Sequence, residues 1–175
     1  MPGLGASYGR GGATTFSADL VNSDAILIMG SNMAECHPVA FRWVIQAKTR
    51  PGRPCVVIHS DPRFTRTSAM ADIYAPLRAG TDIVVLGALI NYVIQNDMYF
   101  KEYVVNYTNA ATLVSADFKD TEELGGVFSG FDSEAKRYDP ASWQYQTGGD
   151  PTLQHPNCVF QILKRHFARY TPEMV

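Results

Sequence analysis

The 175-residue sequence lacks the features that mark several functional classes. It has no run of about eighteen apolar residues, so it predicts no membrane-spanning helix. Its first residues do not combine a basic start with an apolar stretch and therefore do not resemble a signal peptide. The net charge is only −2 and the basic residues are scattered, so the sequence lacks the electrostatic footprint of a protein that binds nucleic acid or an anionic membrane.

Residue patterns for metal binding and hydrolysis are also missing. The three cysteines, Cys36, Cys55 and Cys158, form no CxxC pair and no zinc-like spacing with histidine, which predicts reduced thiols and no metal ligand in this chain. No GxSxG motif is present, and the adjacent carboxylates Glu122 and Glu123 have no apolar wall beside them. We therefore assign no catalytic residue. The GxGxxG motif is absent too, which argues against an ordinary NAD or FAD site.

What the sequence does contain is the composition of a folded domain, with 46% hydrophobic and 18% charged residues. Two short apolar runs, Ala25–Met29 and Cys55–Ile58, are typical of strands buried on both faces of a parallel sheet. The segment 31–48 between them has the spacing of a helix. This order predicts an α/β fold with a Rossmann-like parallel sheet and flanking helices. The apolar helix positions are Val39, Trp43, Val44 and Ala47.

The remaining segments predict further elements and one irregular insertion. Glycine-rich residues 3–14 predict a loop, and residues 116–157, which are rich in Gly, Asp, Ser, Tyr and Pro, predict an insertion that packs on a neighbour. We divide the chain into a nucleotide-binding region (1–115), the insertion (116–157) and the start of a helical segment (158–175). The other predicted elements are a short helix or turn at Phe16–Asn22, helices at Thr67–Ala71, Asp82–Asp97, Tyr99–Tyr107 and Cys158–Tyr170, a strand at Ile73–Ala75 and a hairpin near Tyr145–Thr152.

Three loops follow the predicted strands, and ligands bind at this edge of an open parallel sheet. In the loop Gly30–His37, Gly30 permits close approach to a phosphate. The Asn32 amide adds a side-chain donor to this loop, and the Glu35 carboxylate adds an acceptor. In the loop Asp61–Arg63, the carboxylate is placed to accept hydrogen bonds from both ribose hydroxyls. In the loop Leu77–Asp82, the final carboxylate is placed to accept two N–H bonds from guanine.

Each of these residues also has a simpler interpretation. Asp82 taken alone is better explained as a helix cap, Asp61 as part of a turn, and Gly30 as the end of a strand. His37 precedes a proline at a helix start, where a structural hydrogen bond is the simpler role, and Cys36 beside it points in a different direction on a helix. Three loops at one sheet edge nevertheless favour a ligand site over three unrelated turns.

Several stretches resemble one family closely. They are SYGRGGATT, NSDAILIMGSNMAECHP, SDPRFTRTS, ADIYAPLRAGTDI, YFKEYVVNYTNA and LQHPNCVFQILKRHFARYTP. Together they resemble the large catalytic subunit of the molybdenum- or tungsten-dependent formate dehydrogenases, within the molybdopterin oxidoreductases. The resemblance covers residues 7–175 and is greatest to the respiratory type. Residues 116–157 also resemble the insertion that is characteristic of that type. It implies a periplasmic enzyme, with the cytoplasm as the alternative, that oxidises formate to carbon dioxide.

The resemblance also implies the cofactor and the partners. The ligand would be molybdopterin guanine dinucleotide, with the first loop on its phosphates, Asp61 on the guanosine ribose and Asp82 on the guanine, and with Gly9–Gly12 near the metal side. The partners would be the rest of the catalytic subunit and an iron–sulfur electron-transfer subunit, without nucleic acid and without direct membrane insertion. The cofactor-binding residues implied in this way are Gly30, Ser31, Asn32, Glu35, His37, Asp61, Pro62, Arg63, Gly80 and Asp82.

The family's reactive residues are not found in this sequence. By resemblance, the metal-ligating selenocysteine or cysteine precedes the position of Met1, the cluster-binding cysteines lie further upstream, and the essential arginine lies beyond Val175. We therefore expect a fragment that contributes binding without turnover, as would arise from a selenocysteine codon read as a stop. The alternatives are a stand-alone module for cofactor binding or assembly, and a structural piece with a vestigial nucleotide site.

Overall fold

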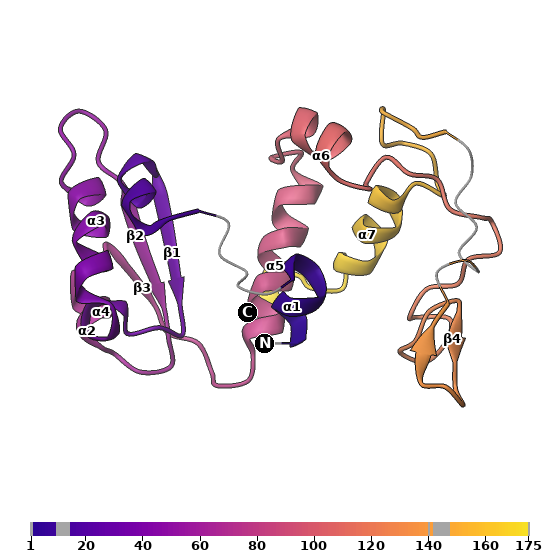
Figure 1. Ribbon diagram of the computed structural model, residues 1–175, viewed down its shortest axis with the longest axis horizontal. Helices are drawn as coiled ribbons and strands as arrows, with labels where there is room; N and C mark the ends of the chain where they lie inside the picture. Colours follow the sequence, from indigo (N-terminus) through magenta and orange to yellow (C-terminus); the bar gives the residue numbers. More distant parts are fainter. Residues whose placement is uncertain (1, 10–14, 140, 142–147, 175) are drawn as a thin grey trace. The chain divides into compact units, whose positions relative to one another are not determined.

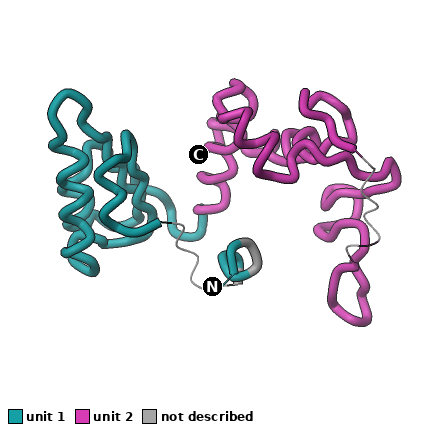
Figure 2. Tube along the Cα trace, turned by 45° about the horizontal axis from the view of Figure 1, so that its top comes forward, with its two compact units in different colours: residues 1–81 teal, residues 82–175 magenta. Residues whose placement is uncertain are grey.

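The computed structural model describes the whole chain except residues 1, 10–14, 140, 142–147 and 175. The chain divides into two compact units, Met1–Thr81 and Asp82–Val175 (Figure 2). We predicted a nucleotide-binding region that continues to residue 115, whereas the boundary between the two compact units falls earlier, after Thr81. The extent of the region that binds nucleotide therefore stays a prediction.

The first unit is built on a three-stranded parallel sheet (Figure 1). Its strands are β1 (Ala25–Met29), β2 (Val56–Ser60) and β3 (Ile73–Ala75), in the order β1-β2-β3. β2 pairs in parallel with both neighbours. This confirms the predicted α/β class with a parallel sheet and helices.

The sheet is buried mainly on one face, although Ser60 at the end of β2 is buried on the other. Ile26 and Ile28 of β1 and Val57 of β2 are buried in a core that includes residues of α3 (Pro38–Lys48). The alternate residues of the strands face the other way, and Leu27 is 46% exposed. The prediction of strands buried on both faces was therefore wrong for this structure. Among the described residues of the first unit, no helix covers the second face, and a short apolar run cannot reveal which faces are covered.

The segment between β1 and β2 forms two helices rather than one. α2 (Met33–Cys36) is separated from α3 by His37 alone. α3 begins at Pro38, which suits a first helical position because proline has no N–H to donate. The buried residues of α3 are Phe41, Val44 and Ala47. Val39, one of the apolar positions whose spacing predicted the helix, is 71% exposed. The helix is turned so that Phe41, which the predicted stripe omitted, packs against the sheet.

The other elements of the first unit are short. A 3₁₀ helix, η1 (Ser17–Asn22), packs against α3 and confirms the short helix or turn predicted at Phe16–Asn22, and α4 (Arg66–Met70) follows β2. The predicted loop at 3–14 was wrong for residues 3–8, which belong to α1 (Pro2–Tyr8), and residues 10–14 of it lie outside the described residues. This helix ends at Gly9, which has a φ of +76° and donates its N–H to the Gly5 carbonyl, a conformation that glycine adopts without a Cβ penalty.

The second unit is mainly helical. α5 begins at Asp82 as predicted, and it packs against α7. Its core includes Leu153 and Cys158, both fully buried. None of the described helices is long and apolar enough to cross a membrane. The elements of this unit are α5 (Asp82–Gln95), α6 (Lys101–Tyr107), β4 (Phe131–Asp132), β5 (Arg137–Tyr138), α7 (Val159–Phe167) and η3 (Pro172–Met174).

The insertion at 116–157 has little regular structure, as predicted. Its hairpin is formed by β4 and β5, earlier in the chain than expected, and residues 145–147 of the predicted hairpin at Tyr145–Thr152 lie outside the described residues. The aromatic rings pack partly on one another: Phe128 and Tyr138 are stacked with centroids 4.1 Å apart, and Phe131 lies 5.1 Å from Tyr138. These contacts stabilise the hairpin from within the insertion.

Asp72 ties the entry of β3 to β2 and α3, and this gives a pH prediction. Its carboxylate pairs with Lys48 at 2.9 Å and accepts the Val57 N–H at 2.8 Å. The hydrogen bond from Lys48, followed by that from Val57, holds the pKa of Asp72 below its ordinary value of 3.8. Because the folded pKa is lowered, this stabilisation is present above the ordinary pKa and is lost as the pH falls through the lower, folded value.

We therefore expect protonation of Asp72 at low pH to lower the free energy of unfolding of the first unit by about 1 kcal/mol or less. The effect is small because the Asp72–Lys48 pair is partly exposed and its attraction is screened by solvent. Denaturant titrations between pH 6 and pH 2.5 measure the loss. In Asp72→Asn, this part of the pH dependence should disappear. An unchanged acid slope in that variant would contradict the assignment.

Candidate functional site

The site begins where the chain leaves β1. Gly30 has a φ of +62° and donates its N–H to the Ser60 carbonyl at 3.0 Å, so it turns the chain away from the sheet at the end of β1. A Cβ at this position would meet nothing within 4 Å, so the space beside Gly30 is open. The N–H groups of Ser31 and Asn32 have no hydrogen-bond acceptor among the described residues. The loop therefore presents two free backbone donors at the carboxyl edge of the sheet.

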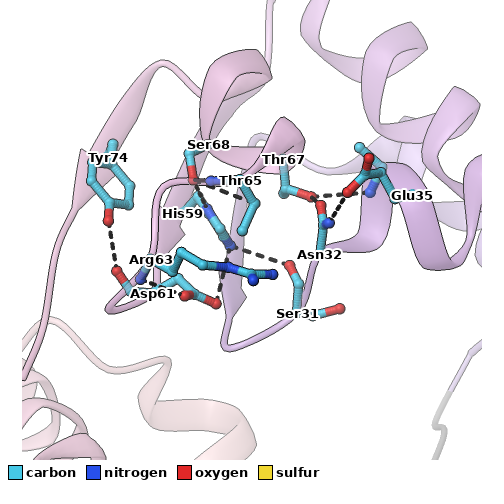
Figure 3. Close-up of polar contacts among 11 residues, drawn as sticks. Ser31, Asn32, Glu35, His59, Asp61, Arg63, Thr65, Thr67, Ser68 and Tyr74 are labelled. Atoms are coloured by element: carbon cyan, nitrogen blue, oxygen red, sulfur yellow. Dashed lines mark hydrogen bonds and ion pairs between the residues drawn. The ribbon is translucent and has the colours of Figure 1, made fainter. Parts of the chain in front are cut away.

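Asp61 lies at the end of the neighbouring strand, β2. Its Oδ1 accepts the Arg63 N–H at 2.8 Å, and its backbone carbonyl accepts the Tyr74 hydroxyl at 2.8 Å (Figure 3). The side chain is 14% exposed. Within the described part of the chain, Oδ2 accepts no hydrogen bond, and His59 Nε2 lies 4.0 Å from it. Oδ1 of Asp61 is thus held in place by a hydrogen bond, and Oδ2 is left available.

A buried histidine joins these two loops. His59 is fully buried on β2, on the same side of the strand as Val57. Its Nδ1 lies 2.8 Å from Ser68 Oγ on α4, and its Nε2 lies 3.2 Å from the Ser31 carbonyl (Figure 3). Ser68 Oγ in turn accepts the Thr65 N–H at 2.8 Å. The first loop is therefore connected to α4 through the His59 ring.

A second connection runs from α4 to α2 through Thr67. Thr67 is fully buried, and its hydroxyl donates to Asn32 Oδ1 at 3.1 Å and accepts the Ala34 N–H at 3.0 Å (Figure 3). Asn32 Nδ2 also donates to Glu35, whose carboxylate pairs with Arg66 at 3.1 Å. The side chains of Asn32 and Glu35, predicted as ligand contacts, are thus engaged within the protein, and they shape the loop.

The structure brings together only some of the predicted residues. Gly30, Ser31, Asn32 and Asp61 are joined through His59 and Thr67. Pro62 and Arg63 are exposed on the second loop, and the Arg63 guanidinium makes no ion pair with a described residue (Figure 3). In the close-up, the Arg63 side chain extends from the Asp61 loop toward Ser31.

No described hydrogen bond joins His37 or Gly80 to this network. His37 lines a separate pocket of about 390 Å³ with Cys36 and Trp43, and no described hydrogen bond joins it to Asp61. Gly80 is exposed with a φ of +86°, in the turn after β3. Asp82 is the exposed first residue of α5 and belongs to the second unit. Among the described residues, no group of three or more His, Cys, Asp or Glu side chains converges as a metal site.

Sequence reasoning missed the buried polar residues that hold the loops. Thr67 and Ser68 were not predicted as site residues, because a polar residue on a short helix usually faces solvent, and His59 was not, because it stands at the end of a predicted strand. Two patterns could have indicated them. His59 follows Val57 by two positions on a strand and so shares its buried face, and Thr65 with Ser68 forms a capping box that places Ser68 beside the strand.

Comparisons with known proteins agree on one family. Residues 5–138 match the molybdopterin oxidoreductase family. The chain is 46% identical to "Formate dehydrogenase 2 subunit alpha (cytochrome c-553)" of Nitratidesulfovibrio vulgaris over 174 residues, which is 96% of this chain and 17% of the relative. It is 46% identical to the nitrate-inducible formate dehydrogenase major subunit of Escherichia coli K12, over 98% of this chain and 17% of the relative.

A more distant relative is "F420-dependent formate dehydrogenase 1 subunit alpha" of Methanococcus maripaludis, which is 39% identical over 61% of this chain and 15% of the relative. The chain thus spans about 17% of the length of the first two relatives. The family match covers most of this chain and includes the loops after β1, β2 and β3. The chain belongs to the molybdopterin oxidoreductase family.

Proposed function

We propose that the first unit binds the guanosine nucleotide end of molybdopterin guanine dinucleotide, and that the chain is part of a formate dehydrogenase catalytic subunit. The observation that carries this proposal is the juxtaposition of a free Asp61 oxygen with a glycine-started loop at the carboxyl edge of a parallel sheet. This edge is where nucleotides bind in Rossmann-like folds, and we propose that the sheet is of that kind. The family match and the formate dehydrogenase relatives support the choice of ligand.

The residues fit the nucleotide part of the cofactor. The available oxygen of Asp61 has the chemistry to accept a hydrogen bond from a ribose hydroxyl, as carboxylates do at the end of the second strand in dinucleotide sites. The open space at Gly30 and the free N–H groups of Ser31 and Asn32 suit a phosphate, which needs donors and close backbone approach. Arg63, an exposed cation without an ion pair among the described residues, adds positive charge.

We propose separate tasks for the protein and the cofactor. When bound, the cofactor supplies the molybdenum or tungsten redox chemistry of formate oxidation. The residues of this chain bind and orient its nucleotide end, and we propose that Gly80 and Asp82 contact the guanine. We also propose that this chain binds without turnover by itself, and that the whole enzyme is periplasmic and combines the rest of the catalytic subunit, including its iron–sulfur cluster, with an electron-transfer subunit.

Binding of GMP tests the proposal. We expect the chain to bind GMP in a calorimetric titration, and Asp61→Asn to weaken this binding about tenfold or more. Hydrogen bonds to a charged group contribute about 1.5–3 kcal/mol, and about 1.4 kcal/mol corresponds to a factor of ten. The amide of asparagine can still accept the Arg63 N–H, so the loop should keep its turn.

The matched control is Asp132→Asn in the hairpin of the second unit. Asp132 Oδ1 accepts the N–H two residues later, as Asp61 Oδ1 does, so the two substitutions change the same kind of turn. The control should leave GMP binding unchanged. If the wild-type chain binds no GMP at millimolar concentration, or if both variants bind GMP as the wild type does, the proposed site is wrong.

A further inference from the structure

The buried ring of His59 has a hydrogen-bonding pattern that fixes the role of each ring nitrogen. The Ser31 carbonyl, 3.2 Å from Nε2, can only accept, so Nε2 carries the proton and donates to it. In the neutral ring Nδ1 is then the acceptor, and Ser68 Oγ at 2.8 Å donates to it. The Ser68 oxygen also accepts the Thr65 N–H at 2.8 Å. A directed chain of hydrogen bonds thus runs from the start of α4 to the loop after β1.

This chain of hydrogen bonds determines how the peptide between Ser31 and Asn32 is turned. In a trans peptide, the carbonyl and the following N–H point in opposite directions across the same plane. Since the Ser31 carbonyl points to the buried His59 ring, the Asn32 N–H points away from it. No described residue accepts that N–H. Without His59, the peptide would lose the contact that holds it in this orientation.

We propose that His59 is a positioning residue that aims the Asn32 N–H at the phosphate of the bound nucleotide. The inference rests on the proposed nucleotide site and adds the device that orders its phosphate contact. His59 does not touch the ligand. It acts through the Ser31–Asn32 peptide, while Ser68 and Thr65 hold the ring from α4. Its effect should therefore be specific to the phosphate rather than to the nucleoside.

Binding of guanosine and GMP to two His59 variants of the full chain tests this role. His59→Leu removes the donor to Ser31, whereas His59→Gln can place an amide N–H near the position of Nε2. We expect His59→Leu to reduce the preference for GMP over guanosine about tenfold, since one hydrogen bond to a charged phosphate is lost. Guanosine binding should change less than about twofold by the same reasoning, because no nucleoside contact is removed. His59→Gln should restore most of the preference.

Each result decides between the proposals. Equal weakening of guanosine and GMP in His59→Leu, or an unchanged preference, would overturn the positioning role while leaving the site supported by Asp61→Asn. Absence of GMP binding in the wild type would overturn both proposals. If circular dichroism shows that His59→Leu does not fold, the decision passes to Ser68→Ala, which leaves the ring but removes its Nδ1 partner. A reduced preference in Ser68→Ala and a retained one in His59→Gln support the proposal, and equal preferences in the two overturn it.

Discussion

Replacement of Phe41 by alanine is expected to lower the free energy of unfolding of the first unit by about 3–5 kcal/mol. Phe41 is 6% exposed and lies in the core cluster with Ile26, Ile28 and Val57. In the part of the first unit that the structure describes, helices pack on one face of this small sheet, so few other side chains can fill the cavity. A loss of this size is a large part of the stability of a domain. Chemical denaturation followed by circular dichroism measures it.

Val39→Ala is the matched control on the same helix. Val39 is 71% exposed, so its truncation should change the free energy of unfolding by less than about 0.5 kcal/mol. Similar losses in Val39→Ala and Phe41→Ala would contradict the assignment of the buried face of α3. At denaturant concentrations near the unfolding transition of Phe41→Ala, this variant should lose GMP binding, because the loops of the site depend on the folded sheet. Asp61→Asn should weaken binding without shifting that transition, which separates a loss of fold from a loss of contact.

The contrast between these positions shows what sequence periodicity can predict. The strands at Ala25–Met29 and Ile73–Ala75 and the start of α5 at Asp82 were predicted at the observed residues, because short apolar runs and an amphipathic helix are local patterns. On α3, Val44 and Ala47 are buried as their spacing predicted, whereas Val39 is exposed and Phe41 is buried, because apolar residues stand around much of this helix and their spacing alone does not select one face. The open face of the sheet was missed because burial depends on which elements cover a strand, and this is not a local property.

The same distinction applies to the candidate site. The loops could be predicted from glycine and aspartate after apolar strands, since those residue types have a local reason to stand there. The hydrogen bonds that join the loops could not, because His59, Thr67 and Ser68 meet only after β2, α4 and the β1 loop come together. The side chains of Asn32 and Glu35 take part in the same hydrogen bonds, and their predicted contact with a ligand stays a prediction.

Leu153 provides a test of backbone strain in the second unit. It is fully buried in the core with Cys158 and Phe160, and its backbone has a φ of +63°, a left-handed conformation that costs most residues about 1 kcal/mol or more. The Leu153 N–H donates to the Asp150 carbonyl at 3.0 Å, and its own carbonyl accepts the Gln161 side chain, so hydrogen bonds hold the backbone in place. Burial of the side chain offsets the strain.

We expect Leu153→Ala to lower the free energy of unfolding of the second unit by about 2–5 kcal/mol, since the burial is lost and the strain remains. Leu153→Gly loses the same burial but relieves the strain, so it should be as stable as Leu153→Ala or more stable by about 1 kcal/mol. Denaturant titrations of both variants give this order.

The opposite order is expected at Leu163, which is 39% exposed within α7. There the glycine variant should be less stable than the alanine variant by about 1 kcal/mol, because glycine is a poor helix former. If glycine is also the less stable replacement at Leu153, its left-handed backbone stores no strain that a side chain must offset. If the order inverts between the two leucines, the conformation at Leu153 is maintained by burial against an unfavourable backbone, and the insertion is anchored to its unit at that residue.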